Sequence, residues 1–396
     1  MVLDRIGIYG GTFNPPHIGH IQAAKYALEQ LKLDKLLLIP ACLPPHKEMA
    51  EGTENPAQRL DMLQLCLDGC SAMQVCDMEL SRGGVSYSVD TVLQLREQYP
   101  KAELIMLMGS DMFAIFQSWK DYTTILQNAS LGVFCRGDKG EKENLTQQKE
   151  VLQGEGATVY LLDNPVINIS STNLRRMLIF GCADPFLHEA VADYIRKNGL
   201  YETDQSLRNL PMDRLEQVVV SLLNPNRVRH VLGCRDTAAD LARHWGVDET
   251  DAARAGLLHD ITKALDGPLQ LTLCSCYGVG LDEFSHNNPK TLHALTGSRV
   301  AERIFGENKA VVDAIASHTT GKGNMNTLEK IIYVADYMEP NRDFPGVDEL
   351  RSLAYADLDK ALKLGLEMTL SMLKIQGREI SPGSYEALRW LEEMGV

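Results

Sequence analysis

Apolar and polar residues alternate in two different patterns along the chain, and the change falls near residue 204. In the first part, short apolar runs alternate with segments of helical spacing. The runs predicted as strands are 5–10, 35–40, 73–76, 103–108, 131–135 and 158–161. The segments predicted as helices are 18–33, 56–68, 88–98, 113–128 and 145–152. Apolar strands that alternate with helices predict a doubly wound, Rossmann-like α/β domain with a parallel sheet.

Beyond this part the pattern is helical throughout. A polar stretch over 204–211 ends in proline and is predicted as a linker between domains at 1–203 and 212–396. The helices predicted after it are 212–223, 226–245, 248–264, 290–304, 309–316, 327–337 and 355–375. Helical spacing without clear strands predicts an all-α bundle.

Composition narrows the class of protein. A chain of 396 residues with 44% apolar residues is expected to fold into two or three domains. The net charge of −14 argues against a broad nucleic-acid surface, although it allows a local phosphate pocket. No apolar run reaches the roughly 20 residues that span a bilayer. The nine cysteines form no CxxC pair and no signal peptide is evident, so we expect a cytoplasmic protein with reduced thiols and no membrane partner. Homo-oligomer formation is left open.

The turn after the first strand has the chemistry of a phosphate site. Gly10 and Gly11 allow backbone N–H groups to approach a phosphate, and the amino end of the next helix attracts anions. His17 and His20 share one helix face and can donate hydrogen bonds to phosphate oxygens. A zinc pair or two capping histidines is the alternative. The stretch fits neither the Walker A nor the GxGxxG pattern.

The stretch from Gly10 to His20 resembles the HxGH signature of the nucleotidyltransferase superfamily. The first 200 residues or so resemble bacterial nicotinate mononucleotide adenylyltransferases, although that family often has Asp where Asn14 stands here. The other matching segments are 44–47, 86–91, 109–111 with Trp119, and 169–175. The resemblance implies that AMP passes from ATP to nicotinate mononucleotide, which gives nicotinate adenine dinucleotide and pyrophosphate, with Mg²⁺ on the ATP phosphates. Nicotinamide mononucleotide and phosphopantetheine are alternative acceptors.

This resemblance also implies roles for single residues. Catalytic roles fall to His17, His20, Lys47 and Arg175. Nucleotide contacts fall to Gly10, Gly11, Thr12, Phe13, Tyr87, Thr91, Gly109, Asp111, Trp119, Arg136, Ser170, Ser171 and Thr172. From the residues alone, 170–172 is an N-cap cluster with Arg175 one turn later, which suits the β- and γ-phosphates of ATP or simply caps a helix. A solvated lysine at 47 and a core tryptophan at 119 are the alternatives at those positions.

The second domain carries histidines within or at the ends of otherwise apolar helices. A buried imidazole or carboxylate without a partner is costly, so the group as a whole favours a metal centre over scattered core histidines. The candidate ligands are His230, His259, Asp260, His293, His318 and Asp336. A mixed nitrogen and oxygen set suits iron, manganese or another divalent ion better than a structural zinc.

This pattern resembles the HD phosphohydrolase superfamily, and most closely the bacterial branch that splits diadenosine tetraphosphate into two ADP. The matching pieces are Arg227 with His230, His259–Asp260 with Lys263, 317–322, and 335–342. The resemblance implies one metal on His230, His259, Asp260 and Asp336, and a second on His293, His318 and the shared Asp260. It implies two transition-metal ions, with iron the family's metal, a catalytic Lys263, and phosphate contacts from Thr320 and Arg342. A nucleotide-sensing regulatory module, or a hydrolase of another nucleotide, is the alternative.

Overall fold

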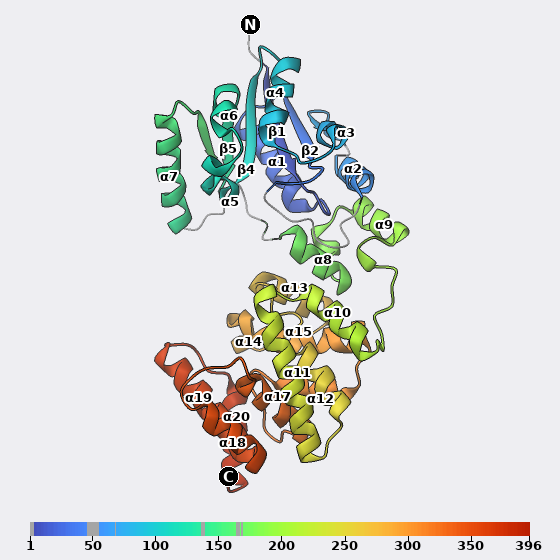
Figure 1. Cartoon of the computed structure of the whole chain (residues 1–396), viewed down its shortest axis with the longest axis vertical. Coiled ribbons are helices and arrows are strands. Elements are labelled where there is room, and N and C mark those ends of the chain that lie inside the picture. Colours follow the sequence, from blue (N-terminus) through green and yellow to red (C-terminus); the bar gives the residue numbers. More distant parts are fainter. Residues whose placement is uncertain (1–3, 46–54, 68, 136–138, 164–166, 168) are drawn as a thin grey trace. The chain divides into compact units, whose positions relative to one another are not determined.

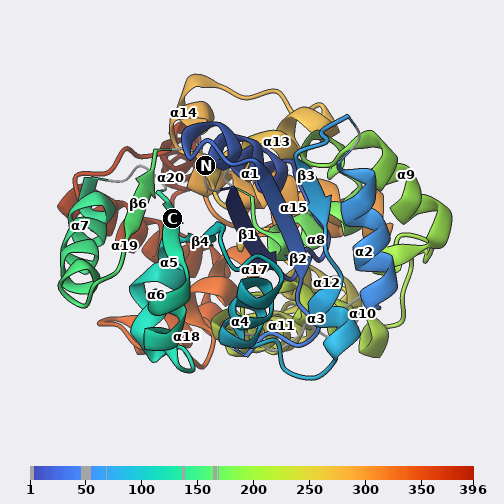
Figure 2. The same cartoon turned by 90° about the horizontal axis from the view of Figure 1, so that it is seen from above.

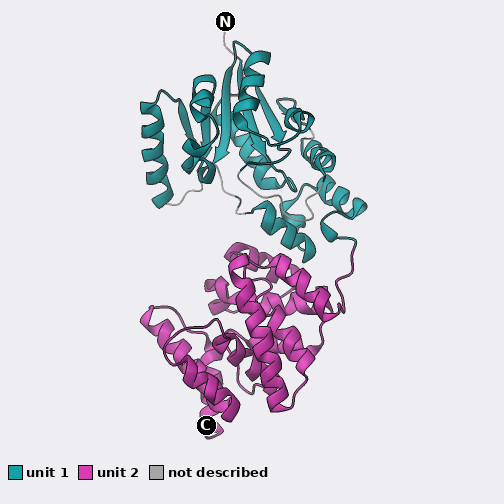
Figure 3. Ribbon diagram, viewed as in Figure 1, with its two compact units in different colours: residues 1–204 teal, residues 205–396 magenta. Residues whose placement is uncertain are grey.

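The chain consists of two compact units, residues 1–204 and 205–396 (Figure 3). The computed structural model describes residues 4–45, 55–67, 69–135, 139–163, 167 and 169–396. The first unit is a mixed α/β domain and the second is helical (Figure 1), as the hydrophobic pattern predicts. Within the described ranges, no helix combines the length and the apolar character that a membrane span requires.

A parallel sheet of six strands forms the centre of the first unit, in the order β3-β2-β1-β4-β5-β6. The strands are β1 (Arg5–Gly11), β2 (Lys35–Pro40), β3 (Met73–Val75), β4 (Glu103–Gly109), β5 (Ser130–Phe134) and β6 (Val159–Leu162). The first three strands run outward from β1 on one side and the last three on the other. The predicted doubly wound sheet is therefore confirmed, and its strand order reverses between β1 and β4.

Helices cover both faces of this sheet (Figure 2). The helices of this unit are α1 (Ile18–Gln30), α2 (Pro56–Leu65), α3 (Met78–Arg82), α4 (Ser88–Gln98), α5 (Ser110–Ala114), α6 (Tyr122–Asn128), α7 (Lys139–Gly154), α8 (Ser171–Ile179) and α9 (Glu189–Asn198), of which α8 and α9 lie beyond the edge of the sheet (Figure 1). One apolar core joins the sheet face of Ile8 and Met106 to α4 through α7. Alternate strand residues such as Leu107 point to the opposite face, where a Cβ on Gly132 would touch Leu107 and Leu31.

The continuous helix predicted over 113–128 is wrong. The segment contains α5, a 3-10 turn η1 (Phe116–Ser118) and α6. Asp121 stands between them with a φ of 49°, in the left-handed region, where a helix cannot continue. Helix α7 is longer than predicted, and α3 and α9 were not predicted at all.

The second unit is the predicted helical domain. Its helices are α10 (Met212–Leu222), α11 (Pro225–Trp245), α12 (Glu249–Leu258), α13 (Gly267–Tyr277), α14 (Glu283–Asn287), α15 (His293–Val300), α16 (Lys309–Ser317), α17 (Thr327–Met338), α18 (Val347–Ala356), α19 (Leu358–Ile375) and α20 (Pro382–Glu393). Helix α11 packs against both α12 and α17, so residues on these three helices can face one point.

Three predicted helix boundaries in this unit are wrong. The helix predicted over 248–264 ends at Leu258, and a series of turns follows it. The helix predicted over 355–375 breaks at Asp357, whose side chain accepts a hydrogen bond from the N–H of Lys360 and so caps α19. The segment 290–304 contains a 3-10 turn, α15 and a π-helical turn (Ala301–Phe305). Helices α13, α14, α18 and α20 were not predicted.

Candidate active sites

In the first unit, the predicted phosphate turn lies where the strand order of the sheet reverses. Strand β1 ends at Gly11 and its neighbour β4 ends at Gly109, with Tyr9 opposite Leu107 in the register. A Cβ placed on Gly10 would have no heavy atom within 4 Å, so there is open space beside the end of β1. Ligands of open α/β sheets bind at this point, outside the carboxyl ends of the strands.

Hydrogen bonds from the end of the unit hold this turn in place. Arg175 of α8 donates to the carbonyl oxygen of Asn14 at 2.7 Å, and Ser171 donates to that of Pro15 at 3.1 Å. The hydroxyl of Tyr201 donates to the side-chain oxygen of Asn14 at 2.8 Å. An amide therefore serves well where the family often has a carboxylate, because its oxygen is the atom used.

The two histidines lie together at the start of α1. Their rings stack with centroids 3.6 Å apart, so they share one face as predicted. The backbone N–H of His17 donates to Nδ1 of His20 at 3.2 Å, which places the proton of a neutral His20 ring on Nε2. The pair also forms a capping box. Among the described residues no third ligand gathers with it, so a zinc pair has no support there.

Burial fixes the charge of His17. The residue is 5% exposed, and its Nδ1 atom has no hydrogen-bond partner. Burial lowers the pKa of His17 to about 4. The ring is therefore neutral near pH 7 and can act as a hydrogen-bonding group rather than as a cation.

The amino end of α8 lies on the same turn. Ser170 is its N-cap, and the serine hydroxyl accepts a hydrogen bond from the N–H of Asn173 at 3.2 Å. The predicted cap is confirmed. Because Ser171 and Arg175 also contact the β1–α1 turn, two helix amino ends converge at one edge of the sheet.

Other predicted nucleotide contacts lie around this edge. Tyr87 is the N-cap of α4, and the ammonium of Lys120 lies 4.3 Å from the centre of its ring. Asp111 is exposed in the first turn of α5. Trp119 packs against Phe116, with ring centroids 5.3 Å apart, beside the main core.

Thr91 is already engaged within the protein. It is 2% exposed, and its hydroxyl donates to Glu79 at 2.6 Å and accepts from Arg82 at 2.9 Å. Lys47 and Arg136 lie outside the described residues. Sequence reasoning missed Arg59 and Tyr201. Both residues contact the β1–α1 turn, but they lie far from it in the sequence, and no local pattern marks such a contact.

In the second unit, all six predicted ligands meet. They come from α11, the turn after α12, the first residue of α15, the end of α16, and α17. Candidate ligand atoms lie within 4.8 Å of one another in three sets, which are His230/His259/Asp260, His259/His318/Asp336 and Asp260/His293/His318. Because α12 ends at Leu258, His259 and Asp260 lie in a turn and both face the centre.

On one side of the centre, ligand atoms have the spacing of a shared ion. Nε2 of His230 lies 3.3 Å from Nε2 of His259 and 3.1 Å from Oδ1 of Asp336. Oδ2 of Asp260 lies 3.7 Å from His230 and 3.5 Å from His259. Atoms that bind one ion at about 2.1 Å are about 3.4 Å apart when the ligands are tetrahedral.

On the other side of the centre, the second carboxylate oxygen of Asp260 faces two further histidines. Its Oδ1 atom lies 3.4 Å from Nε2 of His293 and 3.8 Å from Nε2 of His318. Asp260 is fully buried, and this oxygen has no hydrogen-bond partner in the described structure. A carboxylate with one oxygen on each side matches the shared role that the sequence comparison implied.

Main-chain carbonyls fix three of the four rings. The Nδ1 atoms of His259, His293 and His318 lie 2.7, 2.8 and 2.7 Å from the carbonyl oxygens of Gly256, Lys290 and Ile315. Each Nδ1 is thereby the donor, which turns Nε2 of each ring to the centre, where this nitrogen offers its lone pair to a metal once it carries no proton. Burial also lowers the pKa of His293 and of His318, which keeps those rings neutral.

The fourth ring has a carboxylate partner that sequence reasoning missed. Nδ1 of His230 lies 3.1 Å from Oε1 of Glu339, which is 1% exposed. The other oxygen of Glu339 accepts from the backbone and side-chain nitrogens of Asn341 at 2.7 and 2.8 Å. Glu339 lies three residues after Asp336, directly beyond the last residue of α17, and this closeness in sequence to a predicted ligand is the signal that could have identified it.

The carboxylates are ionised in this environment. Burial opposes ionisation of Asp260, but attraction to His259 outweighs it and holds the pKa of that carboxyl well below its ordinary value. Burial likewise opposes ionisation of Asp336, and the hydrogen bond from His230 lowers its pKa. Four imidazoles and two carboxylates, with one buried oxygen that accepts no hydrogen bond, are a donor set that fits divalent transition metals.

Three cations stand at the edge of this centre, and each is bonded to a ligand carboxylate. Arg227 pairs with Asp260, Lys263 lies 3.4 Å from Asp260, and Arg342 lies 2.7 Å from Asp336. Their side chains are 30%, 40% and 32% exposed, so they face solvent as well as the centre. Groups placed in this way can contact an anion that reaches the centre from solvent.

The threonine that contacts the centre is Thr319, whereas the prediction named Thr320. The hydroxyl of Thr319 lies 3.0 Å from Nε2 of His293 and 3.1 Å from Nε2 of His318, so it belongs to the centre. The hydroxyl of Thr320 donates to the carbonyl of Gly321 at 3.2 Å instead.

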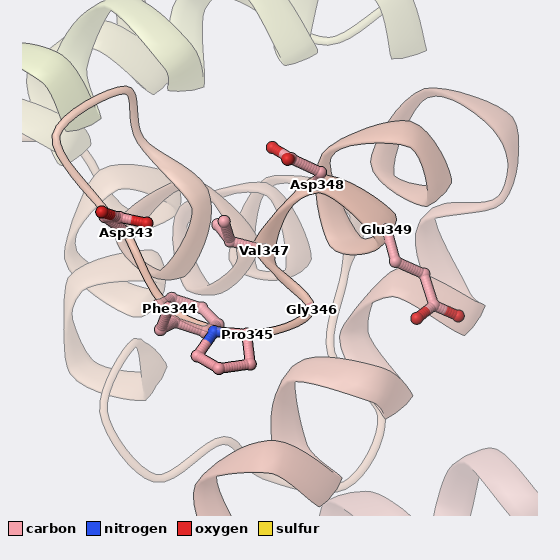
Figure 4. Close-up of a pocket in the computed structure, with 7 residues that line it drawn as sticks. All are labelled: Asp343, Phe344, Pro345, Gly346, Val347, Asp348 and Glu349. Atoms are coloured by element: carbon pink, nitrogen blue, oxygen red, sulfur yellow. The ribbon is translucent and has the colours of Figure 1, made fainter.

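A pocket of about 450 Å³ opens beside the loop that follows Arg342 (Figure 4). It is lined by residues 343–349, which include the exposed carboxylates of Asp343, Asp348 and Glu349. Negative charge at this pocket disfavours the binding of an anion such as phosphate.

Comparison with known proteins divides the chain in the same way. The Cytidylyltransferase-like family model matches residues 8–177, and the HD domain model matches residues 227–341. A probable nicotinate-nucleotide adenylyltransferase from Dictyoglomus thermophilum is 37% identical over 198 residues, which are 50% of this chain and 99% of that protein.

Two solved structures are similar to one half each. A predicted HD superfamily hydrolase involved in NAD metabolism, from Clostridium acetobutylicum, is 38% identical, with a TM-score of 0.46, and covers 47% of this chain and 98% of its own. Nicotinic acid mononucleotide adenylyltransferase from Plasmodium falciparum, complexed with NaAD, is 18% identical, with a TM-score of 0.42, and covers 50% of this chain and 98% of its own.

The buried position of His17 predicts a titration that is displaced to acid pH. Its ring resonances, assigned with a His17→Gln variant, should not shift between pH 8 and 5.5. A histidine-containing peptide in the same buffer should titrate near its ordinary pKa of about 6.5. Since the folded pKa is the lower one, the unfolded state binds more protons below pH 6.5, and this residue should reduce stability as the pH falls toward 4. Titration of the ring near 6.5 in the folded protein would contradict this result.

The contact between Gly233 and Glu339 predicts how the His230 side of the centre depends on its support. A Cβ on Gly233 would lie 2.4 Å from Oε2 of Glu339, so Gly233→Ala must displace the carboxylate from His230. Metal affinity, measured by competition with a chromophoric chelator, should fall roughly 10- to 100-fold. Gly280→Ala is the matched control, because a Cβ there has no neighbour within 4 Å. Equal affinity in the two variants would show that Glu339 does not support His230.

Proposed function

This chain belongs, through its first unit, to the nicotinate-nucleotide adenylyltransferase family, and we propose that it is a bifunctional nucleotide enzyme with a second active site in its HD domain. The first unit transfers AMP from ATP to nicotinate mononucleotide. The second hydrolyses diadenosine tetraphosphate symmetrically. The observation that supports the first activity best is the stacked His17–His20 pair, in which His17 is neutral, at the sheet edge where α8 also begins.

The proposed transfer is an in-line displacement at phosphorus. A phosphate oxygen of nicotinate mononucleotide attacks the α-phosphorus of ATP, and the bond from that phosphorus to the bridging oxygen of the pyrophosphate group breaks. Pyrophosphate leaves with the electron pair, and nicotinate adenine dinucleotide forms. Mg²⁺ enters as the counter-ion of the ATP substrate. Such reactions depend on positioning and on neutralisation of charge rather than on a covalent intermediate.

The residues around the β1–α1 turn have different roles in this reaction. His20, with its Nε2 proton, donates a hydrogen bond to a phosphate oxygen in the transition state. His17 stacks on that ring and holds its orientation through the backbone hydrogen bond. The amino end of α8, with Ser170, Thr172 and Arg175, binds the pyrophosphate part of ATP.

For the second unit, we propose that water attacks a phosphorus atom of diadenosine tetraphosphate so that the central P–O–P bond breaks and two ADP molecules are released. Divalent metal ions supply Lewis-acid activation of the water and the phosphate when they are bound. His230, His259, Asp260 and Asp336 would hold one ion, and Asp260, His293 and His318 the other.

The contacts around the ligand set support a polyphosphate substrate. Arg227, Lys263 and Arg342 are half exposed beside the ligand carboxylates, and their positive charges suit a chain of four phosphates. Lys263 also lies 2.9 Å from Nε2 of His293, so one ammonium contacts both a bridging carboxylate and a ligand ring. We propose that Lys263 and Arg342 neutralise charge on the departing ADP.

Two substitutions should separate the two activities. His20→Ala should lower adenylyl transfer by roughly 100-fold or more, because it removes the donor to phosphate, and should leave hydrolysis of diadenosine tetraphosphate unchanged. Asp260→Ala should abolish hydrolysis and reduce bound metal, because it removes the oxygens that face both sides of the centre, and should leave the transfer unchanged. Both reactions are followed by chromatography of the nucleotides.

Exposed histidines of the same units provide the controls. His188→Ala in the first unit and His286→Ala in the second should change neither activity. If either single substitution at an active site removes both activities, the two sites are not independent. Full metal content in Asp260→Ala would remove that residue from the ligand set.

A further inference from the structure

Arg59 is a buried cation beneath the turn that follows β1. It lies in α2 and is 1% exposed. Its Nη1 atom donates to the carbonyl oxygen of Thr12 at 2.7 Å and to that of Ala41 at 2.9 Å. These carbonyls stand where the β1–β2 ladder ends, one step beyond the hydrogen bond from the N–H of Ala41 to the carbonyl of Gly11. Arg59 therefore joins the carboxyl edges of two neighbouring strands.

Among the residues that the structure describes, no carboxylate balances the charge of this guanidinium. Arginine keeps its charge in proteins, and buried charges are usually paired. Within the ranges that the structure describes, both of its hydrogen bonds go to carbonyls, and its Nε atom has no hydrogen-bond partner. Burial lowers the pKa of Arg59, and the groups that oppose this are Tyr201 and Cys42 rather than an acid. An uncompensated positive charge in a medium of low dielectric attracts an anion more strongly than one in water.

The hydrogen bond to Thr12 also fixes the direction of the next N–H group. The peptide between Thr12 and Phe13 is trans, so its N–H points away from its carbonyl oxygen and hence away from Arg59. Among the described residues the N–H of Phe13 makes no hydrogen bond, although Phe13 is 1% exposed and has a φ of 46°. A buried N–H group without a partner is rare, and a backbone held in the left-handed region needs support from its surroundings.

We propose that Arg59 is a positioning residue for adenylyl transfer, which turns the N–H of Phe13 toward the phosphates of ATP and adds a buried positive charge beneath them. This inference rests on the transferase activity proposed for the first unit. Arg59 does not touch the substrate. It acts through the Thr12–Phe13 peptide and through its electrostatic field, which is pre-organised because both carbonyls hold the guanidinium in place.

The unit contains a second arginine that serves as a matched control. Arg96 of α4 donates to the carbonyls of Ala102 at 2.7 Å and of Asn128. These residues stand just before β4 and β5, at the amino edge of the sheet, whereas the turn lies at the carboxyl edge. Arg59 and Arg96 thus make the same kind of contact at opposite edges, so Arg96→Met reports the structural cost of losing such a contact.

The experiment compares Arg59→Met, Arg59→Lys and Arg96→Met in the full chain, with ATP and nicotinate mononucleotide as substrates. Arg59→Met should lower kcat on the order of 100-fold, as loss of a pre-organised electrostatic group does, while Arg96→Met lowers Tm without this loss. Arg59→Lys keeps the charge but cannot span both carbonyls, so its kcat should lie between those of wild type and Arg59→Met.

Three results would overturn or redirect the proposal. Equal kcat in Arg59→Met and Arg96→Met would show that Arg59 only stabilises the fold. If Arg59→Met does not fold, an unchanged kcat in Arg59→Lys would have the same meaning. If the wild-type chain transfers no AMP, the proposed function fails. The rise of Tm with MgATP would then still test Arg59, since an equal rise in wild type and Arg59→Lys contradicts its role beneath the phosphates.

Discussion

Both sites depend on one kind of interaction, in which a main-chain carbonyl accepts a hydrogen bond from a functional side chain. In the second unit the carbonyls of Gly256, Lys290 and Ile315 orient three imidazole rings, so that each ring turns its Nε2 atom to the centre. In the first unit the relation is reversed, because arginine and serine side chains hold the carbonyls of the β1–α1 turn. The carbonyls of Gly256 and Ile315 are held by their own helices, and those of the β1–α1 turn by side chains of neighbouring helices, so both sites inherit the rigidity of the fold.

The candidate metal centre combines carboxylates with histidines and cations because a buried charge needs partners that balance it. Asp260 is completely buried, and an isolated carboxylate there would be protonated rather than charged. Arg227, Lys263 and the surrounding histidines keep it ionised, and the oxygen that accepts no hydrogen bond faces His293 and His318. Without such neighbours the unit could not keep two carboxylates in an apolar bundle. The same requirement accounts for Glu339, whose two oxygens are both satisfied by hydrogen bonds.

The sequence predicted the features that follow from local patterns. Apolar runs located the six strands, the glycine turn located the edge of the sheet, and the histidines located the ligand set. The errors arose where the structure is determined by a single backbone angle or by a contact between residues that are distant in the sequence. The end of α12 at Leu258 lies within an apolar stretch that continues the helical spacing, and Asp121 breaks a predicted helix through its φ angle. Arg59 could not be identified, because its partners Thr12 and Ala41 become neighbours only in the folded sheet.

The central claim is that one chain carries two separate nucleotide sites, of which the second is a metal-dependent hydrolase. The most direct test is a metal analysis of anaerobically purified protein, followed by incubation with diadenosine tetraphosphate and chromatography of the products. The account predicts about two transition-metal ions per chain, as two half-sites that share one carboxylate imply, and ADP as the sole product. A chain without metal, or one that binds metal and releases ATP and AMP or nothing, would contradict it.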